Sequence, residues 1–289
     1  MSDPISWDAG LIRRYDKAGP LYTASPPVAQ YSDGILPNDL FAALRESGRL
    51  DRPLSLYIHI PFCANACHYC WCPRVITKDR SRAQPYLTAL YREMELVAGH
   101  LEGDQPVQRL HLGGGTPTFL GHADLTELMA RVRRHFHLHE DDNADYSVEV
   151  DPREADWPTL GLLREPGFNR VSLGVQDLDP EVQRAVNRLQ SLEQTQAVMD
   201  AARALAYRSV SMDLMYGLPG QTGNSFAHTL ERVLEMKPDR LTLHNYVHLP
   251  QLHASQRHID ESRLPGRDER LAIYARSQCQ LLQAGYRYI

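Results

Sequence analysis

The sequence predicts an α/β fold, and within that class a partial (β/α)6-type barrel with parallel strands. Short β-rich runs alternate with helical segments along most of the chain, which is typical of strand–helix–strand units with a parallel sheet. Many such units follow one another, which favours a barrel. A doubly wound sheet usually has a glycine-rich turn after its first strand, whereas the corresponding turn here is rich in cysteine.

Hydrophobic periodicity places the elements in order. Residues 1–50 are rich in Pro and Gly, contain a short helical piece at 38–46, and are predicted to form an N-terminal extension to a barrel domain at 51–289. The predicted strands of that domain are 54–60, 109–112, 146–150, 170–174, 209–214 and 240–245. The predicted helices are 83–100, 123–136, 156–164, 179–187, 193–206, 223–236 and 267–284.

The last four residues, 286–289, have β character and follow Gly285, which is a normal position just past the end of a helix. We therefore expect the sequence to end inside a seventh strand. A barrel of this kind would be truncated before completion and would leave a strand edge bare.

Composition limits the classes of function. The chain has 289 residues, of which 43% are hydrophobic and 23% charged, as in a globular protein with a core, and its formal net charge is −5. No basic groove or polybasic patch indicates a nucleic-acid or membrane partner. No apolar run reaches the roughly 18 residues of a membrane span, and the opening does not resemble a signal peptide. We expect a cytoplasmic monomer.

Four cysteines follow the first predicted strand with the spacing C-x3-C-x2-C-x-C: Cys63, Cys67, Cys70 and Cys72. Three thiolates on one short loop can hold three corners of a 4Fe-4S cluster and leave the fourth iron open to a small chelating ligand. The alternative is a structural zinc site that uses all four cysteines, although zinc sites usually draw their ligands from two separated pairs. Cys279 stands apart and is expected to be a half-buried small hydrophobic residue.

Polar residues recur where the predicted strands end. In a parallel barrel these ends share one face, where catalytic residues gather. Glu149 and Asp151 end the third strand, although they could instead cap the following helix. The other polar side chains are Gln176 and Asp177 after the fourth strand, Arg188 after the next helix and Asp213 at the end of the fifth strand. The glycine run Gly113–Pro117 after the second strand offers backbone groups to a ligand.

The cysteine loop, with an aromatic residue just before its third cysteine, resembles the signature of the radical S-adenosylmethionine (SAM) superfamily. The resemblance implies that Cys63, Cys67 and Cys70 ligate a 4Fe-4S cluster and that Cys72 does not. It also implies that SAM chelates the open iron through its amino and carboxylate groups. One-electron reduction would then cleave SAM to methionine and a 5′-deoxyadenosyl radical that abstracts a hydrogen atom.

Further motifs resemble the oxygen-independent coproporphyrinogen III oxidase family. These include YIHIPFC at 57–63, HLGGGTPT at 111–118, EVDPRE at 149–154, GVQD at 174–177, VNR at 186–188, DLMYGLP at 213–219 and NYVHLP at 245–250. The resemblance implies oxidative decarboxylation of coproporphyrinogen III to protoporphyrinogen IX in haem biosynthesis. It requires an electron donor and no catalytic residue beyond the SAM-derived radical.

The same resemblance implies two SAM molecules. The residues implied for the SAM molecule on the cluster are Tyr57, Gly114 and Glu149. Those implied for the second SAM molecule are Tyr69, Gly115, Thr116, Gln176, Arg188, Asp213 and Val247.

The chain departs from this family at three places. Residues 20–26 lack the Arg and the second Tyr of the family's opening segment, and Pro166 is expected to end the preceding helix. The family also continues beyond Ile289 into a C-terminal domain, so we expect this chain to hold a cluster but to decarboxylate poorly. Two alternatives are a haem-trafficking relative, a group that generally lacks the fourth cysteine, and an inactive truncated paralogue.

Overall fold

The computed structural model describes residues 8–15, 34–50, 52–139, 141 and 143–289, so the predicted opening motif at 20–26 lies outside the described residues. The chain divides into two compact units, residues 1–43 and 44–289. Helix α1 (Ala9–Tyr15) lies in the first unit, and helix α2 (Pro37–Arg49) begins in the first and ends in the second. The assignment of residues 1–50 to an extension stays a prediction.

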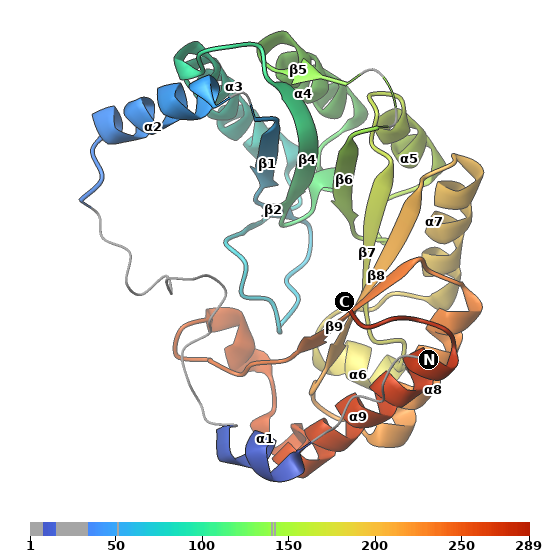
Figure 1. Ribbon diagram of the computed structural model, residues 1–289. Coiled ribbons are helices and arrows are strands. Elements are labelled where there is room, and N and C mark those ends of the chain that lie inside the picture. Colours follow the sequence, from blue (N-terminus) through green and yellow to red (C-terminus); the bar gives the residue numbers. More distant parts are fainter. Residues whose placement is uncertain (1–7, 16–33, 51, 140, 142) are drawn as a thin grey trace. The chain divides into compact units, whose positions relative to one another are not determined.

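The second unit is built on a parallel sheet whose order follows the chain, as predicted for a partial barrel (Figure 1). Its two-residue strand β5 (His137–Leu138) pairs with β4 alone, and a separate ladder joins β2 (Phe62–Cys63) to β3 (Val75–Ile76). The main strands, in sheet order, are β1 (Leu54–Ile60), β4 (Pro106–Gly114), β6 (Asp145–Val150), β7 (Arg170–Gln176), β8 (Ser209–Tyr216) and β9 (Arg240–Asn245).

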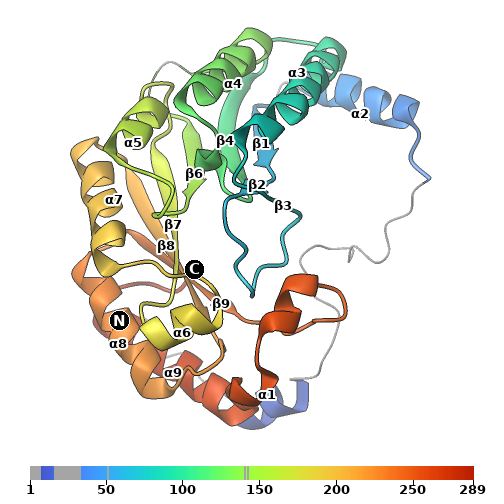
Figure 2. The same cartoon turned by 180° about the vertical axis from the view of Figure 1, so that it is seen from behind.

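Most of the helices that follow the strands lie along the outer side of this curved sheet, as the front and back views show (Figures 1 and 2). Among the described residues, no helix combines the length and the apolar character that a membrane crossing needs. The helices are α3 (Ala83–His100), α4 (His122–His135), α5 (Trp157–Arg164), α6 (Pro180–Ala185), α7 (Leu192–Ala204), α8 (Gly223–Glu235) and α9 (Arg267–Gln283).

The two faces of the sheet differ in chemistry because successive side chains of a strand point to opposite faces. Leu112, Val148 and Leu173 are buried in the hydrophobic core beneath the helices. Their neighbours along the same strands, such as Glu149 and Ser172, are only partly buried and face the other way. The inner face of the sheet is therefore polar, and the carboxyl ends of its strands supply the site described below.

The chain end differs from the prediction. Tyr286–Ile289 pair with no strand among the described residues, so the expected seventh strand is absent. The Tyr286 hydroxyl instead donates to the Pro238 carbonyl, and the Tyr286 backbone N–H donates to the Leu281 carbonyl at the end of α9. The backbone bond holds Tyr286 against the end of α9. Tyr286 packs on the hydrophobic core, whereas Tyr288 and Ile289 are exposed, so the β character of the segment reflects residue type without a strand partner.

Replacing Asn169 with alanine is expected to lower the free energy of unfolding. The buried Asn169 amide donates to the Ala144 carbonyl and accepts from the Tyr146 N–H, and so joins the start of β7 to the start of β6. Asn169→Ala leaves these buried groups unpaired, which costs about 1–3 kcal/mol. Urea denaturation measures the loss. Asn143→Ala, at an exposed position bonded to Asp141, serves as the control and should be near neutral.

Candidate cofactor site at the carboxyl ends of the strands

A cavity of ≈ 390 Å³ lies where the strands of the main sheet end. It brings together the predicted site residues from β2, the cysteine loop, β4, β6, β7, β8 and the segment after α6. Tyr57 and Val247 are the predicted residues that do not line it. The predicted residues that do are Cys63, Cys67, Tyr69, Cys70, Gly114, Gly115, Thr116, Glu149, Gln176, Arg188 and Asp213.

The cysteine loop is closed at its base by the β2–β3 ladder, in which Phe62 pairs with Val75 and Cys63 with Ile76. Two further backbone bonds, from Val75 N–H to the Pro61 carbonyl and from Thr77 N–H to the Cys63 carbonyl, reinforce this base. The loop therefore leaves and re-enters the fold at a single point. All four of its cysteines, including Cys72, line the cavity as free thiols.

Side chains from the loop itself and from a segment far along the chain hold the carbonyl groups of the loop. The Arg74 guanidinium donates to the Cys70 carbonyl at 2.9 Å and to the Cys72 carbonyl at 3.1 Å, and it also contacts Ser255. The buried Gln256 amide donates to the Tyr69 carbonyl at 3.2 Å. Because these side chains hold the backbone of the loop, the loop can present its thiols to the cavity.

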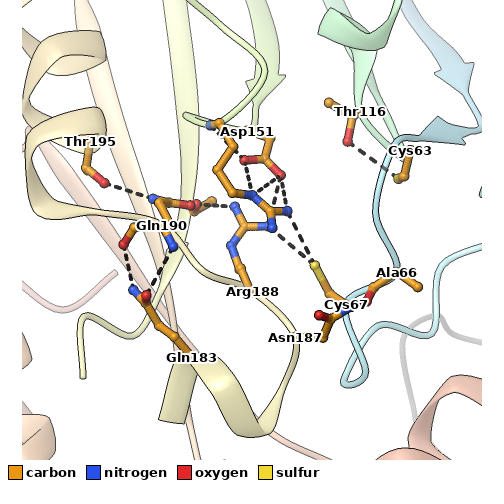
Figure 3. A network of polar contacts seen from close by, with 12 residues as sticks. Cys63, Ala66, Cys67, Thr116, Asp151, Gln183, Asn187, Arg188, Gln190 and Thr195 are labelled. Carbon is orange, nitrogen blue, oxygen red and sulfur yellow. Dashed lines mark hydrogen bonds and ion pairs between the residues drawn. The ribbon is translucent and has the colours of Figure 1, made fainter. Parts of the chain in front are cut away.

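A buried charge network lies beside Cys67 (Figure 3). The Asp151 carboxylate accepts from Arg153 at 2.7 Å and from Arg188 at 3.0 Å. Both guanidinium groups also reach the Cys67 sulfur, each at 3.6 Å. The three charged side chains are 7–13% exposed, so water screens their attraction little.

The network shifts the pKa values of its members. Burial alone would raise the pKa of Asp151, but the nearby charges of Arg188 and Arg153 outweigh burial and lower it. Burial likewise opposes the charged form of Arg188, yet Tyr69, Asp151 and Cys67 raise its pKa above the usual value. Asp151 is therefore ionised and both arginines are charged at neutral pH.

The thiols differ in their surroundings. Burial raises the pKa of Cys63, and the Thr116 hydroxyl, 3.5 Å from the Cys63 sulfur, opposes this. A hydrogen bond with Cys72 lowers the pKa of Cys70 to about 6, against the effect of burial. Cys70 therefore has marked thiolate character at neutral pH, as a metal ligand requires.

Glycines after β4 allow the backbone to approach the cysteine loop. A Cβ on Gly115 would lie 2.8 Å from the Phe62 carbonyl oxygen and 2.9 Å from the Cys63 sulfur. Gly114 has φ = 120°, a conformation that other residues rarely adopt. Only glycine fits at either position, so the turn presents backbone rather than side chain to the cavity.

Two buried polar atoms on the cavity lining find no hydrogen-bond partner among the described residues. They are Oε1 of Gln176 and Nε of Arg188. A buried polar atom without a partner is costly unless a ligand or water satisfies it. With three thiols, these atoms and a backbone turn on one cavity, the donor set fits an iron–sulfur cluster together with a polar small molecule.

Glu149 faces the cavity and does not cap a helix, so the capping alternative for Glu149 and Asp151 is wrong. The cap of α5 is Asp156, which accepts from the Thr159 N–H. Glu149 accepts from the Gly114 N–H at 3.1 Å and contacts His111 at 3.2 Å.

The two predicted residues outside the cavity lining are differently placed. Tyr57 stacks on His111, with ring centroids 5.6 Å apart, and is thus one residue removed from Glu149. Val247 follows β9, and its carbonyl accepts from the buried Gln256 amide. Val247 therefore touches the residue that holds the cysteine loop.

Sequence reasoning missed the residues that support the loop and the network. Arg153 was part of a recognised motif but had no assigned role, although an arginine two residues after a strand-end aspartate was a signal for this pair. Arg74, Ser255 and Gln256 gave no signal. Ser255 bonds to a carbonyl 185 positions away in the chain, and no local pattern reports such a contact.

Comparison with known proteins identifies the fold family. Residues 57–233, more than half of the chain, match the Radical SAM superfamily. The chain belongs to the radical SAM superfamily. Membership implies SAM and a 4Fe-4S cluster as cofactors and removes support from the zinc alternative. Among the described residues, no three His, Cys, Asp or Glu side chains lie close enough to hold a single metal ion.

Named radical SAM relatives are similar over nearly the whole chain. The oxygen-independent coproporphyrinogen III oxidase of Pseudomonas aeruginosa is 56% identical over 100% of this chain and 63% of its own length. The Salmonella typhimurium enzyme of the same name is 45% identical, with coverage of 99% and 61%. The solved structure of the Escherichia coli coproporphyrinogen III oxidase, which is described as a radical SAM enzyme, is 42% identical and has a TM-score of 0.91. The match covers 98% of this chain and 63% of the Escherichia coli chain. This chain thus spans less than two thirds of the length of these relatives.

Replacing Asp151 with asparagine is expected to destabilise the fold strongly. Asp151→Asn leaves two buried guanidinium charges without their counter-ion, a change that costs about 3–5 kcal/mol. Urea denaturation at pH 7 measures it. Asp145→Asn is the matched control, because Asp145 pairs with Arg170 on a more exposed part of the sheet and should cost less than about 1 kcal/mol.

The cost of Asp151→Asn should also depend on pH. The folded pKa of Asp151 is lowered, so its stabilising effect is full above the unfolded-state pKa of about 3.9 and is lost as the pH falls through the folded value. The difference between wild type and variant should therefore shrink below pH 4. A difference that stays constant down to pH 2 would show that Asp151 carries no such charge interaction.

Proposed function

We propose that this chain carries the catalytic core of a radical SAM enzyme that decarboxylates coproporphyrinogen III to protoporphyrinogen IX. The proposal is supported by one observation above others. The cavity gathers the motif residues shared with that family, and oxidases of that name are similar over nearly the whole chain. Because the chain spans 63% of those relatives, the complete activity is a proposal for the protein to which this sequence belongs.

In this proposal Cys63, Cys67 and Cys70 hold a 4Fe-4S cluster. With SAM on its open iron, the reduced cluster would supply the hydrogen-abstracting radical. Glu149 and the Gly114 backbone, which are joined by the bond from the Gly114 N–H to the Glu149 carboxylate, would bind the amino acid end of SAM through their remaining acceptor atoms. Tyr57 stacks on His111 beside them.

A second SAM molecule is assigned to the remaining predicted residues. The unpartnered Oε1 of Gln176 and Nε of Arg188 support a polar ligand beside these residues. Asp213, whose carboxylate accepts from the Ser172 hydroxyl, lines the same cavity. Tyr69, Gly115 and Thr116 would complete this position. Val247 would act from the loop after β9, outside the cavity lining described above.

The reaction removes one hydrogen atom from the propionate carbon next to the macrocycle. The carboxylate then leaves as carbon dioxide, one electron passes to an acceptor, and a vinyl group remains. Two propionates react in turn. Each turnover also needs one electron from a donor to reduce the cluster, so we propose an electron-donor partner in the cytoplasm.

Anaerobic reconstitution tests the proposal. We expect the protein to bind four irons and four sulfides, to cleave SAM under reducing conditions, and to act on coproporphyrinogen III. Cys70→Ala should lose the cluster and both reactions. Cys279→Ala, at an exposed thiol outside the cavity, is the matched control and should keep them.

Three outcomes would contradict the proposal. Zinc in place of iron, or a colourless protein, would overturn the cluster. Haem binding and transfer without protoporphyrinogen formation would favour the trafficking alternative. A cluster that never cleaves SAM would favour the inactive paralogue.

A further inference from the structure

The three thiols proposed to hold the cluster have unequal hydrogen-bond donors. Cys63 has one neutral donor, the Thr116 hydroxyl at 3.5 Å. Cys67 has two cationic donors, Arg153 and Arg188, each at 3.6 Å. A cation that donates to a thiolate stabilises negative charge on sulfur more than a hydroxyl does. Among the described residues, guanidinium groups thus donate directly to the sulfur of Cys67, whereas the charge of Arg74 acts on Cys63 and Cys70 without a hydrogen bond to either sulfur.

The geometry of Arg153 is fixed by Asp151. The Arg153 Nε and Nη2 groups both donate to the Asp151 carboxylate, and the Arg153 backbone N–H does so at 3.0 Å. The same Nη2 is the atom that reaches Cys67. Two charged arginines share one carboxylate here, so the network carries a net charge of +1 next to the Cys67 sulfur.

Arg153 and Arg188 differ in what else they do. Arg188 also donates to the Gly174 carbonyl of β7, and its buried Nε has no hydrogen-bond partner among the described residues. Within the described part of the chain, the Arg153 side chain donates hydrogen bonds to Asp151 and Cys67 alone. Arg153 therefore offers a way to change the donor to Cys67 while leaving the β7 contact in place.

We propose that Arg153, held by Asp151, is a positioning residue that raises the reduction potential of the cluster by donating a hydrogen bond to the Cys67 thiolate. This inference rests on the proposed cluster. Reduction places one more negative charge on the cluster and its sulfur ligands, so a nearby cationic donor stabilises the reduced form more than the oxidised form. Hydrogen bonds to the sulfurs and local charge are among the main determinants of such potentials. The low exposure of the network keeps this effect large.

The test is a reductive titration of the reconstituted protein without SAM, followed by electron paramagnetic resonance. Arg153→Gln removes the charge and is expected to lower the midpoint potential while the iron and sulfide content stays at the wild-type level. Arg153→Lys keeps the charge but loses the planar two-point contact with Asp151, and should give a smaller fall. Arg131→Gln, an exposed arginine on α4 paired with Glu127, should leave the potential unchanged.

The outcomes are separable. A wild-type protein that assembles no cluster refutes the proposed function before any variant is made. If the cluster assembles and both Arg153 variants titrate at the wild-type potential, this inference alone is wrong. Should Arg153→Gln fail to fold, the lysine variant decides: a lower potential with full iron content supports the inference, and an unchanged potential overturns it.

Discussion

The site depends above all on the parallel register of the main strands. Because all of them run the same way, their carboxyl ends meet at one edge, and residues far apart in the sequence become neighbours. The register pairs Ile60 with Gly114, Glu149 with Ser172 and Gly174 with Asp213. Shifting any one strand by a single residue would turn its polar side chains into the core.

The buried network beside Cys67 shows a second constraint. Placing charged groups at 7–13% exposure is costly unless each is paired and hydrogen-bonded. A single carboxylate is too little to neutralise two arginines, so the network keeps an excess positive charge. That excess is a natural counter-charge for thiolates and for an anionic cluster. The same imbalance makes the network a poor device for stability alone, which favours a role in holding the cofactor.

Much of the fold could be predicted from the sequence because the local periodicity of hydrophobic residues indicates each helix and strand. The apolar alternation at 146–150 and 170–174 identified β6 and β7 to within a few residues. The strand at 109–112 was predicted too short, since β4 extends from Pro106 to Gly114, where proline and glycine hide the pattern. The prediction of a strand at 286–289 was wrong for a different reason. A segment with β propensity forms a strand only when it pairs with another strand, and propensity alone does not supply that partner.

The clustering of the predicted residues followed from topology, since the carboxyl ends of all strands in a parallel sheet lie at the same edge. The residues that hold the loop could not be predicted in this way. Arg74 reaches carbonyls on its own loop, and Ser255 and Gln256 come from a short helix much later in the chain. Their residue types are common on protein surfaces, so only the three-dimensional arrangement distinguishes them.

These distant contacts determine the order in which the site can form. An isolated loop with four cysteines has many conformations, and fixing each residue costs about 1–2 kcal/mol in entropy. The carbonyl contacts from Ser255 and Gln256 offset part of that cost, but they exist only after β9 and the segment that follows it have folded onto the cavity. The cysteine loop near the start of the barrel is therefore preorganised by residues near its end. In the proposed function, a cluster would bind to a loop that the rest of the domain has already shaped.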